Sequence, residues 1–328
     1  MGAGEIGLPA LRWLIDESGG EIAGVFTQPD KPVGRKRTLT PPEVKVLAEA
    51  RGIPVFQPES FRKNPEALEA LRALRPDLIV VMAYGQILPR SVIEAPAIAC
   101  VNLHASLLPR HRGAAPIQAA ILAGDPESGI TLMHIVPRLD AGDMILKKAI
   151  PLAPDETGGS LHDRLAALGP AVLAEGLPPL VSGAAPREPQ DEALATYAGK
   201  LERDDGEIDW SRPAEEIARR IRAYDPWPGT HTWLETGGET RKLKLFPPCR
   251  AETGPDPTGS GPGPNPVGSV RRGSGEAGGL RVACGGGTCL VFPAESGWQL
   301  EGRKRLALSE FLRGQALPDG TKLGRAAQ

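Results

Sequence analysis

The residues best suited to chemistry lie together in the stretch Asn102-Leu-His-Ala-Ser-Leu-Leu-Pro-Arg-His-Arg-Gly-Ala-Ala-Pro116. The amide of Asn102, the imidazole of His104 and the hydroxyl of Ser106 can donate hydrogen bonds, and the imidazole can also move a proton. The stretch follows an apolar run at 98–101 that is typical of a buried strand. Alternate residues of a strand share a face, so Asn102 and His104 are predicted to project together at the strand's carboxyl end. Open α/β sheets keep their sites at that end.

Strands and helices alternate along the first half of the chain. This alternation predicts an α/β fold, specifically a doubly wound, mostly parallel, Rossmann-like sheet. Strands are expected at 22–26, 54–56, 77–83, 98–101, 130–136 and 144–152, and helices at 43–50, 65–74, 114–123 and 160–176.

The chain opens with Met1-Gly-Ala-Gly-Glu-Ile-Gly7, a Gly-x-Gly-x-x-Gly pattern that leads into a helix. A dinucleotide site also needs a strand before the first glycine and an acidic residue at the end of the second strand. Neither is present, so the glycines are interpreted as allowing a tight turn. A parallel sheet normally has a strand that feeds its first helix. We therefore hypothesise that the first strand is missing, that Met1 is internal and that the natural start lies upstream.

The second half of the chain has a different composition. A polar, proline-bearing segment at 186–192 is typical of a linker, and short β-like runs after residue 230 suggest a small barrel. Residues 252–279 are rich in Gly, Pro and Ser and are predicted to form a disordered insertion. The predicted domains are a catalytic domain at 1–185, a linker at 186–206 and a C-terminal domain at 207–328.

Composition excludes several classes of protein. The 328-residue chain has a formal net charge of −2, so binding to nucleic acid would depend on local basic patches. The four cysteines form no disulfide framework and are interpreted as reduced thiols of a cytoplasmic protein. Neither a signal peptide nor a run of membrane-spanning length is recognisable, and no metal site is suggested.

Several motifs, from Gly2 to about Trp233, resemble those of the folate-dependent formyltransferases, and within them the methionyl-tRNA formyltransferase family. Each motif alone is weak, and together they are specific. As they stand in this chain they are Phe26-Thr-Gln-Pro-Asp-Lys-Pro-Val-Gly-Arg35, Val81-Met-Ala-Tyr-Gly85, the stretch 102–116, Leu139-Asp-Ala-Gly-Asp143, Thr196-Tyr-Ala-Gly-Lys-Leu201 and Ile208-Asp-Trp210.

The resemblance implies transfer of a formyl group from 10-formyltetrahydrofolate to the methionine amine of initiator Met-tRNA, for translation initiation. This is acyl transfer, which requires stabilisation of an oxyanion and handling of a proton. The Asn102 amide and a protonated His104 would stabilise the oxygen, and the carboxylate that the family supplies matches Asp140. Asp143 is interpreted as structural and His111 as a surface residue near the substrate. The family's folate-contacting segment matches four residues, Ser106, Leu107, Leu108 and Pro109.

Two basic segments are candidates for binding the tRNA. Residues 28–42 form a Pro/Gly-punctuated loop with almost no apolar anchor, and its composition alone fits either a solvated linker or a phosphate clamp. The resemblance favours the clamp, with Lys31, Arg35, Lys36 and Arg37 binding RNA. Arg303, Lys304 and Arg305 near the C-terminus either face RNA or form a solvated surface. The family also implies an oligonucleotide-binding-like (OB-like) barrel here, and a monomer is expected.

Two other functions remain open. The first is a formyltransferase or 10-formyltetrahydrofolate hydrolase that acts on a small molecule; the basic loop and the second domain argue against it. The second is a catalytically silent RNA-binding protein; the intact trio of Asn102, His104 and Asp140 argues against that.

Overall fold

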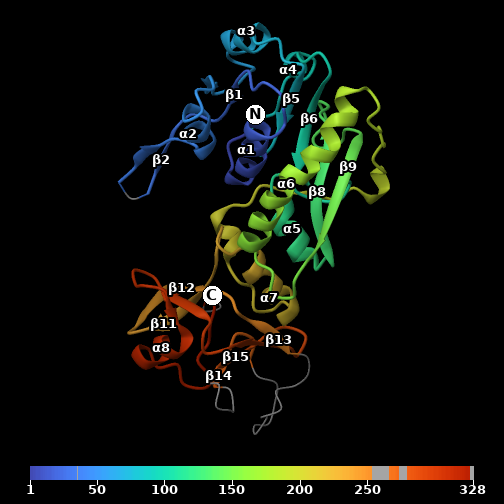
Figure 1. Cartoon of the computed structure of the whole chain (residues 1–328). Coiled ribbons are helices and arrows are strands. Elements are labelled where there is room, and N and C mark those ends of the chain that lie inside the picture. Colours follow the sequence, from blue (N-terminus) through green and yellow to red (C-terminus); the bar gives the residue numbers. More distant parts are fainter. Residues whose placement is uncertain (35, 253–265, 273–278, 326–328) are drawn as a thin grey trace. The chain divides into compact units, whose positions relative to one another are not determined.

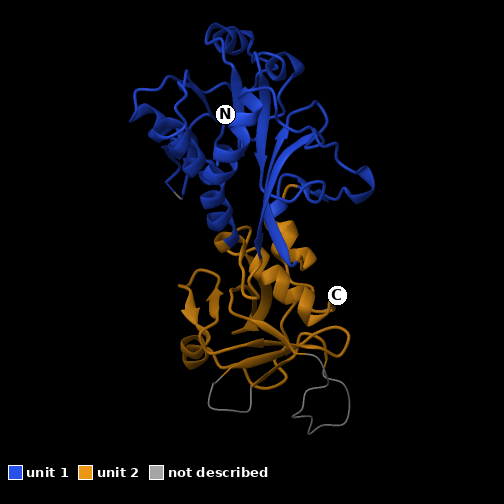
Figure 2. Cartoon of the chain, turned by 45° about the vertical axis from the view of Figure 1, so that its right-hand side comes forward, with its two compact units in different colours: residues 1–117, 126–151, 161–199 blue, residues 118–125, 152–160, 200–328 orange. Residues whose placement is uncertain are grey.

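The computed structural model describes residues 1–34, 36–252, 266–272 and 279–325 (Figure 1). The chain divides into two compact units, shown in Figure 2. Unit 1 contains residues 1–117, 126–151 and 161–199, and unit 2 contains residues 118–125, 152–160 and 200–328. Each unit therefore takes segments from distant parts of the sequence, and the two are described separately below.

The main sheet of unit 1 has the strand order β5-β6-β8-β9, from β5 (Leu78–Val81), β6 (Ala99–His104), β8 (Glu127–His134) and β9 (Met144–Pro151). Strands β5 and β6 are parallel, whereas β6–β8 and β8–β9 are antiparallel. A second, parallel pair joins β1 (Val25–Phe26) to β4 (Val55–Phe56). The prediction of a mostly parallel sheet is therefore wrong for β8 and β9. Strand periodicity shows which residues are buried but does not show the direction of the neighbouring strand.

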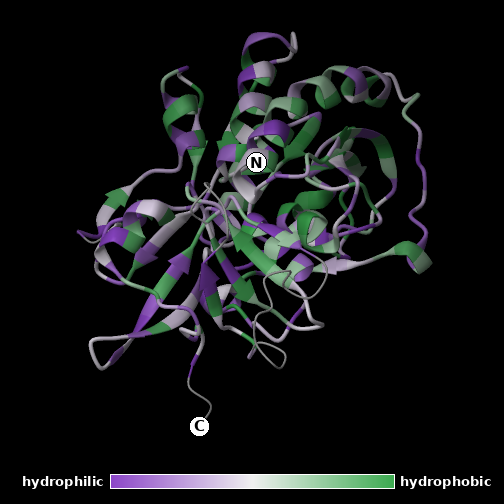
Figure 3. Cartoon of the chain, turned by 90° about the horizontal axis from the view of Figure 1, so that it is seen from below, coloured by the Kyte–Doolittle hydropathy of each residue, from purple (hydrophilic) through white to green (hydrophobic). Residues whose placement is uncertain are grey.

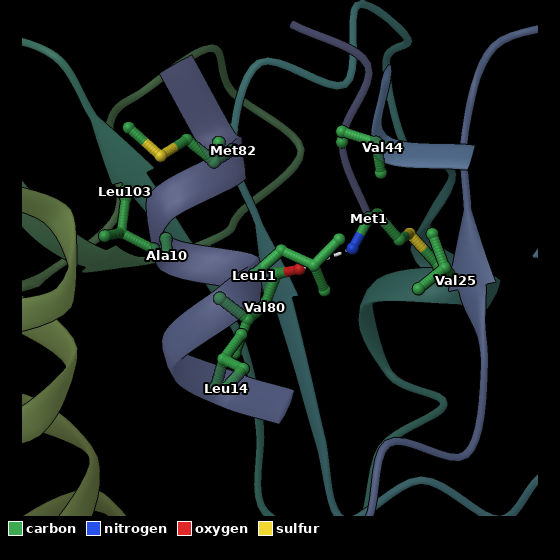
Figure 4. A pocket seen from close by; sticks show the side chains of 11 residues that line it. Met1, Ala10, Leu11, Leu14, Val25, Val44, Val80, Met82 and Leu103 are labelled. Atoms are coloured by element: carbon green, nitrogen blue, oxygen red, sulfur yellow. Dashed lines mark hydrogen bonds between the residues drawn. The ribbon is translucent and has the colours of Figure 1, made fainter. Parts of the chain in front are cut away.

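The first residues of the chain join the two parallel parts of unit 1. The amide of Gly2 donates to the Phe26 carbonyl, and the amide of Met82 donates to the Met1 carbonyl. A Cβ on Gly2 would lie 2.8 Å from the Met82 oxygen, so this close backbone approach requires glycine. Beside it lies an apolar pocket, in which the Met1 amine donates to the Val80 carbonyl (Figure 4). Burial lowers the pKa of this amine to about 6.

Helices surround the sheets of unit 1, and the predicted helices are all present with shifted ends. The longest, α6, extends to Val181 through Pro178 and Pro179, five residues beyond its predicted end. It packs on the main sheet, because Gly176 lies against the side chains of Leu132 and Leu146. The helices that contribute to unit 1 are η1 (Glu5–Gly7), α1 (Leu8–Asp16), α2 (Glu43–Glu49), α3 (Pro65–Ala73), α4 (Arg90–Ile93), α5 (Pro116–Ala123), α6 (Gly158–Val181) and η2 (Glu192–Leu194).

The basic loop at 28–42 contains a short antiparallel hairpin. Strand β2 (Lys31–Val33) pairs in antiparallel register with β3 (Thr38–Thr40). Its base is anchored, because the Asp30 carboxylate accepts hydrogen bonds from Lys45 and Gln57. The β-branched pair Val33–Thr38 and this polar anchor stabilise the hairpin without any buried apolar residue in either strand.

The segment predicted to be a linker is packed against unit 1 up to residue 199. Its strand β10 (Tyr197–Ala198) pairs in parallel with β7 (Arg112–Gly113). Strand β7 belongs to the stretch that follows His104. The segment that contains β10 is therefore paired with the same stretch of chain that contains the candidate catalytic residues.

The described residues of unit 2 form two antiparallel sheets, each with four strands, that share one apolar core. The core includes Trp298, Phe292 and Ile221, each at most 1% exposed. The strand orders are β11-β12-β17-β18 and β13-β16-β15-β14. The elements are η3 (Arg203–Gly206), α7 (Ala214–Ala223), β11 (Thr230–Thr236), β12 (Glu239–Leu245), β13 (Arg250–Glu252), β14 (Val270–Arg272), β15 (Leu280–Ala283), β16 (Cys289–Phe292), β17 (Gly297–Leu300), β18 (Leu306–Ala307) and α8 (Leu308–Gly314).

Part of the predicted disordered insertion is ordered. Strand β14, at 270–272, pairs with β15, and Val270 is fully buried in the core of unit 2. The prediction is therefore wrong for these residues, because a three-residue strand inside a Gly/Pro-rich segment is too short to give a periodic signal. Residues 253–265 and 273–278 lie outside the described residues.

Hydrophobic and hydrophilic residues alternate along many helices and strands, as Figure 3 shows. This pattern is what directs one face of each element into a core. Within the described part of the chain, none of the helices has the length and apolar character needed to cross a membrane.

Candidate active site

His104 ends strand β6, and both of its ring nitrogens face hydrogen-bond acceptors. Nε2 lies 2.9 Å from the carbonyl oxygen of His111, and Nδ1 lies 3.7 Å from Oδ2 of Asp140. A carbonyl oxygen only accepts, so Nε2 carries a proton and donates it. The imidazolium form is the one that presents an N–H to the Asp140 carboxylate as well. The side chain of His104 is only 6% exposed, so this arrangement is shielded from bulk water.

Asn102 lies two residues before His104 in the same strand. The prediction that both residues belong to the carboxyl end of one strand is confirmed, because β6 runs from Ala99 to His104. The register pairs Asn102 with Val81 on one side and Met133 on the other, which places it inside the four-stranded sheet. Asn102 is half-buried, whereas His104 is buried. The strand therefore presents an amide and an imidazole two residues apart.

Asp140 comes from the loop between β8 and β9, and the structure brings it to His104. Its Oδ2 atom accepts a hydrogen bond of 2.8 Å from the amide of Gly113. Its backbone has a φ of 46°, in the left-handed region that non-glycine residues rarely adopt. Asp143, by contrast, pairs with Arg187 at 3.1 Å on a more exposed part of the loop, and its structural role stays a prediction.

The four residues predicted to contact folate, Ser106 to Pro109, form the turn after β6. The Ser106 hydroxyl donates to the Arg110 carbonyl at 2.7 Å, which is the role of a turn residue. Leu108 is 1% exposed and packs with Met133 and Met144, so its side chain belongs to the core. Leu107 is half-buried, and Pro109 follows a cis peptide bond. That this segment contacts folate stays a prediction, and Leu107 and the backbone are the parts best able to do so.

His111 is not a surface residue, contrary to the prediction. It is 7% exposed, its carbonyl accepts from His104, and its amide donates to the Thr196 hydroxyl at 2.8 Å. The backbone of His111 has a φ of 59°, in the left-handed region, and its carbonyl faces Nε2 of His104. The flanking arginines suggested exposure, but the turn buries the ring beneath the segment that contains Thr196.

Sequence reasoning missed Arg112 and Gln190. Arg112 is completely buried, and its guanidinium donates to Gln190 and to both carboxylate oxygens of Glu192. These partners are 78 and 80 residues away in the sequence. Because the partners are so distant, no local sequence pattern reveals this cluster.

The basic residues predicted to bind RNA lie in two places. Lys31, Lys36 and Arg37 are exposed on the β2–β3 hairpin of unit 1, and Arg35 lies outside the described residues. Arg303, Lys304 and Arg305 are exposed in unit 2. The Arg305 guanidinium stacks 3.9 Å from the centroid of the Phe246 ring, so it also contributes to packing. Among the described residues, no three His, Cys, Asp or Glu side chains are grouped to hold a metal ion.

Comparisons with known proteins identify the family of this chain. A model of the formyl transferase family matches residues 9–177, and one of the formyl transferase C-terminal domain matches residues 200–316. An N-formyltransferase from Helicobacter canadensis has a similar fold, with a TM-score of 0.60, 16% identity, and coverage of 89% of this chain and 97% of that chain. The chain belongs to the formyltransferase family.

Two relatives with similar sequences indicate the subfamily to which the chain belongs. It is 52% identical to a methionyl-tRNA formyltransferase of Akkermansia muciniphila, over 96% of this chain and 95% of that protein. It is 46% identical to a methionyl-tRNA formyltransferase of Geobacter sulfurreducens, over 99% of this chain and 96% of that protein. Within the family, it is therefore a member of the methionyl-tRNA formyltransferases.

Proposed function

We propose that this protein transfers the formyl group of 10-formyltetrahydrofolate to the amino group of methionine on initiator Met-tRNA, for translation initiation. The observation that carries the proposal is the buried His104–Asp140 contact beside Asn102 in a chain 52% identical to a methionyl-tRNA formyltransferase. Formyl transfer to an amine needs a neutral nucleophile, donors for an oxygen that becomes negative, and an acceptor for the amine proton.

Each of the three residues has one part in the proposed reaction. The methionine amine attacks the formyl carbon of the folate substrate, the bond from this carbon to the folate nitrogen breaks, and tetrahydrofolate leaves with a proton on that nitrogen. The Asn102 amide donates a hydrogen bond to the formyl oxygen as it gains charge, and so does Nδ1–H of the His104 imidazolium, which at 3.7 Å from Asp140 is not committed to a hydrogen bond with that carboxylate. Asp140 keeps His104 oriented and accepts the proton that the methionine amine loses, directly or through water. Segment 106–109 contacts the folate with its backbone and Leu107, while Leu108 holds the segment to the core.

The tRNA is bound by basic residues of both units in this proposal. Lys31, Lys36 and Arg37 of the hairpin, together with Arg35, neutralise phosphates of the acceptor stem, and Arg303–Arg305 contact a second part of the backbone. Unit 2, with two antiparallel sheets around one core, is proposed to be an OB-like barrel. We further propose a monomer that acts in the cytoplasm, where translation begins.

The test is transfer of labelled formyl from 10-formyltetrahydrofolate to methionyl initiator tRNA. The expected result is labelled formyl-methionyl-tRNA, with no label on tRNA that carries no methionine. Labelling of a small amine in preference to the charged tRNA would favour a small-molecule formyltransferase, and release of formate without transfer would favour a hydrolase. Tight RNA binding with no chemistry would favour an RNA-binding protein. Each of these three results would overturn the proposal.

A further inference from the structure

The segment from Arg187 to Ala198, called the strap below, crosses the two loops that meet at His104. At its start, Glu188 exchanges two backbone hydrogen bonds with Met144, the first residue of β9. At its end, β10 pairs with β7, and the Ala198 carbonyl accepts from the amide of Ala114 at 2.8 Å. A Cβ on Gly113 would lie 2.4 Å from the Ala198 oxygen, at a φ of 119°. Only glycine therefore lets the strap pass over the residue whose amide holds Asp140.

In the middle of the strap, the side chain of Gln190 makes three hydrogen bonds. Its amide nitrogen donates to the carbonyls of Asp140 and Gly142, each at 2.8 Å. Its oxygen accepts from Nε of Arg112 at 2.9 Å. The orientation of the amide is unambiguous, because a guanidinium cannot accept and two carbonyls cannot donate. Gln190 thus holds the backbone of the Asp140 loop through its hydrogen bonds to these two carbonyls.

Arg112 fixes Gln190 in that orientation. Its charge is buried but paired, because Glu192 of the strap accepts from both terminal nitrogens at 3.0 and 3.2 Å. Burial acts to lower the pKa of Arg112, but hydrogen bonds with Glu192 and Tyr197 outweigh it and raise the pKa above its usual range. Arg112 is therefore a permanent cation, held against the strap by Gln190 and Glu192.

The Asp140 backbone needs this support. Asp140 lies in the left-handed region with a φ of 46°, and the preceding residue, Leu139, is 55% exposed. A non-glycine residue in this conformation relaxes unless its surroundings hold it. The carboxylate itself has one backbone donor, from Gly113. The direction in which it points thus depends on the backbone that Gln190 holds through the carbonyls of Asp140 and Gly142.

We propose that Gln190 and Arg112 are positioning residues, which hold the Asp140 loop in the conformation that directs its carboxylate at Nδ1 of His104. Neither residue acts on the substrate directly. This inference rests on the proposed function, since it assumes that Asp140 takes part in formyl transfer.

A double-mutant cycle on the full chain tests the inference. Gln190→Ala removes the two donors to the loop, and Asp140→Asn removes the group that they position. In the wild-type background, Gln190→Ala is expected to lower kcat by about 10- to 100-fold, with KM for either substrate changed less than about threefold. In the Asp140→Asn background, the same change is expected to alter kcat by less than about twofold, because the two residues act in series.

Two further variants control for a merely structural effect. Gln190→Glu keeps the shape and the pairing with Arg112 but loses the donors, so it is expected to lower kcat as Gln190→Ala does. Arg187→Ala removes an exposed ion pair of the same strap, with Asp143, and is expected to leave kcat within about twofold of wild type.

The outcomes separate this inference from the proposed function. Equal effects of Gln190→Ala in both backgrounds, or an effect on KM alone, would overturn the positioning role while formyl transfer stands. If Gln190→Ala unfolds the chain, Gln190→Glu decides the matter by the same two measurements. If Asp140→Asn retains full activity, the proposed catalytic role of Asp140 fails and the inference fails with it.

Discussion

The Nδ1 atom of His104 lies 3.7 Å from Oδ2 of Asp140, although the first residue ends strand β6 and the second lies in the loop between β8 and β9. The same carboxylate oxygen accepts from the amide of Gly113. On its other side, His104 donates to the His111 carbonyl. Nε2 of the imidazole is therefore held by a carbonyl oxygen while Nδ1 faces a carboxylate, and the two contacts fix the orientation of the ring.

Removal of the His104 imidazole is expected to lower kcat by about 10²- to 10⁴-fold, because a charged donor is lost from a buried site. The variant is His104→Ala, assayed by formyl transfer with both substrates at saturation. His162→Ala is the matched control, since His162 is a partly exposed residue that contacts Asp163. Equal activity of the two variants would contradict the assigned role.

Truncation of Leu108 is expected to act on stability. Leu108→Ala should lower the free energy of unfolding by about 2–5 kcal/mol, because it leaves a cavity beside Met133 and Met144. The KM for 10-formyltetrahydrofolate should change less than about threefold. Denaturant unfolding and steady-state kinetics on the same preparation check both expectations. A large rise in KM without loss of stability would show instead that the Leu108 side chain lies in the folate cleft.

Neutralisation of the hairpin is expected to weaken tRNA binding in a salt-dependent way. Lys31→Ala with Lys36→Ala removes two exposed charges, so the slope of log affinity against log salt should become shallower by about 1 for each phosphate that these lysines no longer neutralise. The KM for tRNA should rise while the KM for the folate substrate stays unchanged. Lys63→Ala, at another exposed position of unit 1, supplies the control. An unchanged slope would exclude phosphate binding by these two lysines.

A decrease in pH is expected to lower the free energy of unfolding of unit 2, because it favours protonation of His231, which the unfolded chain allows more readily. This residue is 5% exposed, and burial, followed by the nearby charge of Lys242, lowers its pKa from the usual 6.5. Glu207 opposes this shift but does not cancel it. Between the two pKa values the unfolded chain binds a proton that the folded chain does not, so stability falls as the pH decreases below about 6.5.

The measurement is the free energy of unfolding at several pH values between about 5 and 7.5, a range that spans the usual histidine pKa. The variant His231→Gln carries no titrating group at this position and should show a shallower decrease toward acid than the wild type. Identical slopes for the two proteins would mean that His231 titrates with the same pKa in the folded and unfolded states.

The sequence by itself predicted most of the elements and a candidate trio of polar groups, Asn102, His104 and Asp140. Apolar runs and helical spacing were sufficient to place β6 and to put Asn102 and His104 two residues apart at its end, since both depend only on local periodicity. Family motifs identified Asp140 as the third member. These features are encoded by neighbouring residues, and they are present in the structure within a few residues of their predicted positions.

Tertiary structure alone decided what holds the trio in place. The strap was predicted to be a linker, because polar residues and prolines are as typical of a linker as of a segment that hydrogen-bonds to loops. Arg112 and Gln190 meet across 78 residues, and Glu192 joins them only because β10 pairs with β7. The direction of β8 and β9, and the burial of Val270 in a Gly/Pro-rich stretch, were likewise decided by distant partners. Contacts between residues so far apart leave no periodic trace in the chain, so only the folded structure reveals them.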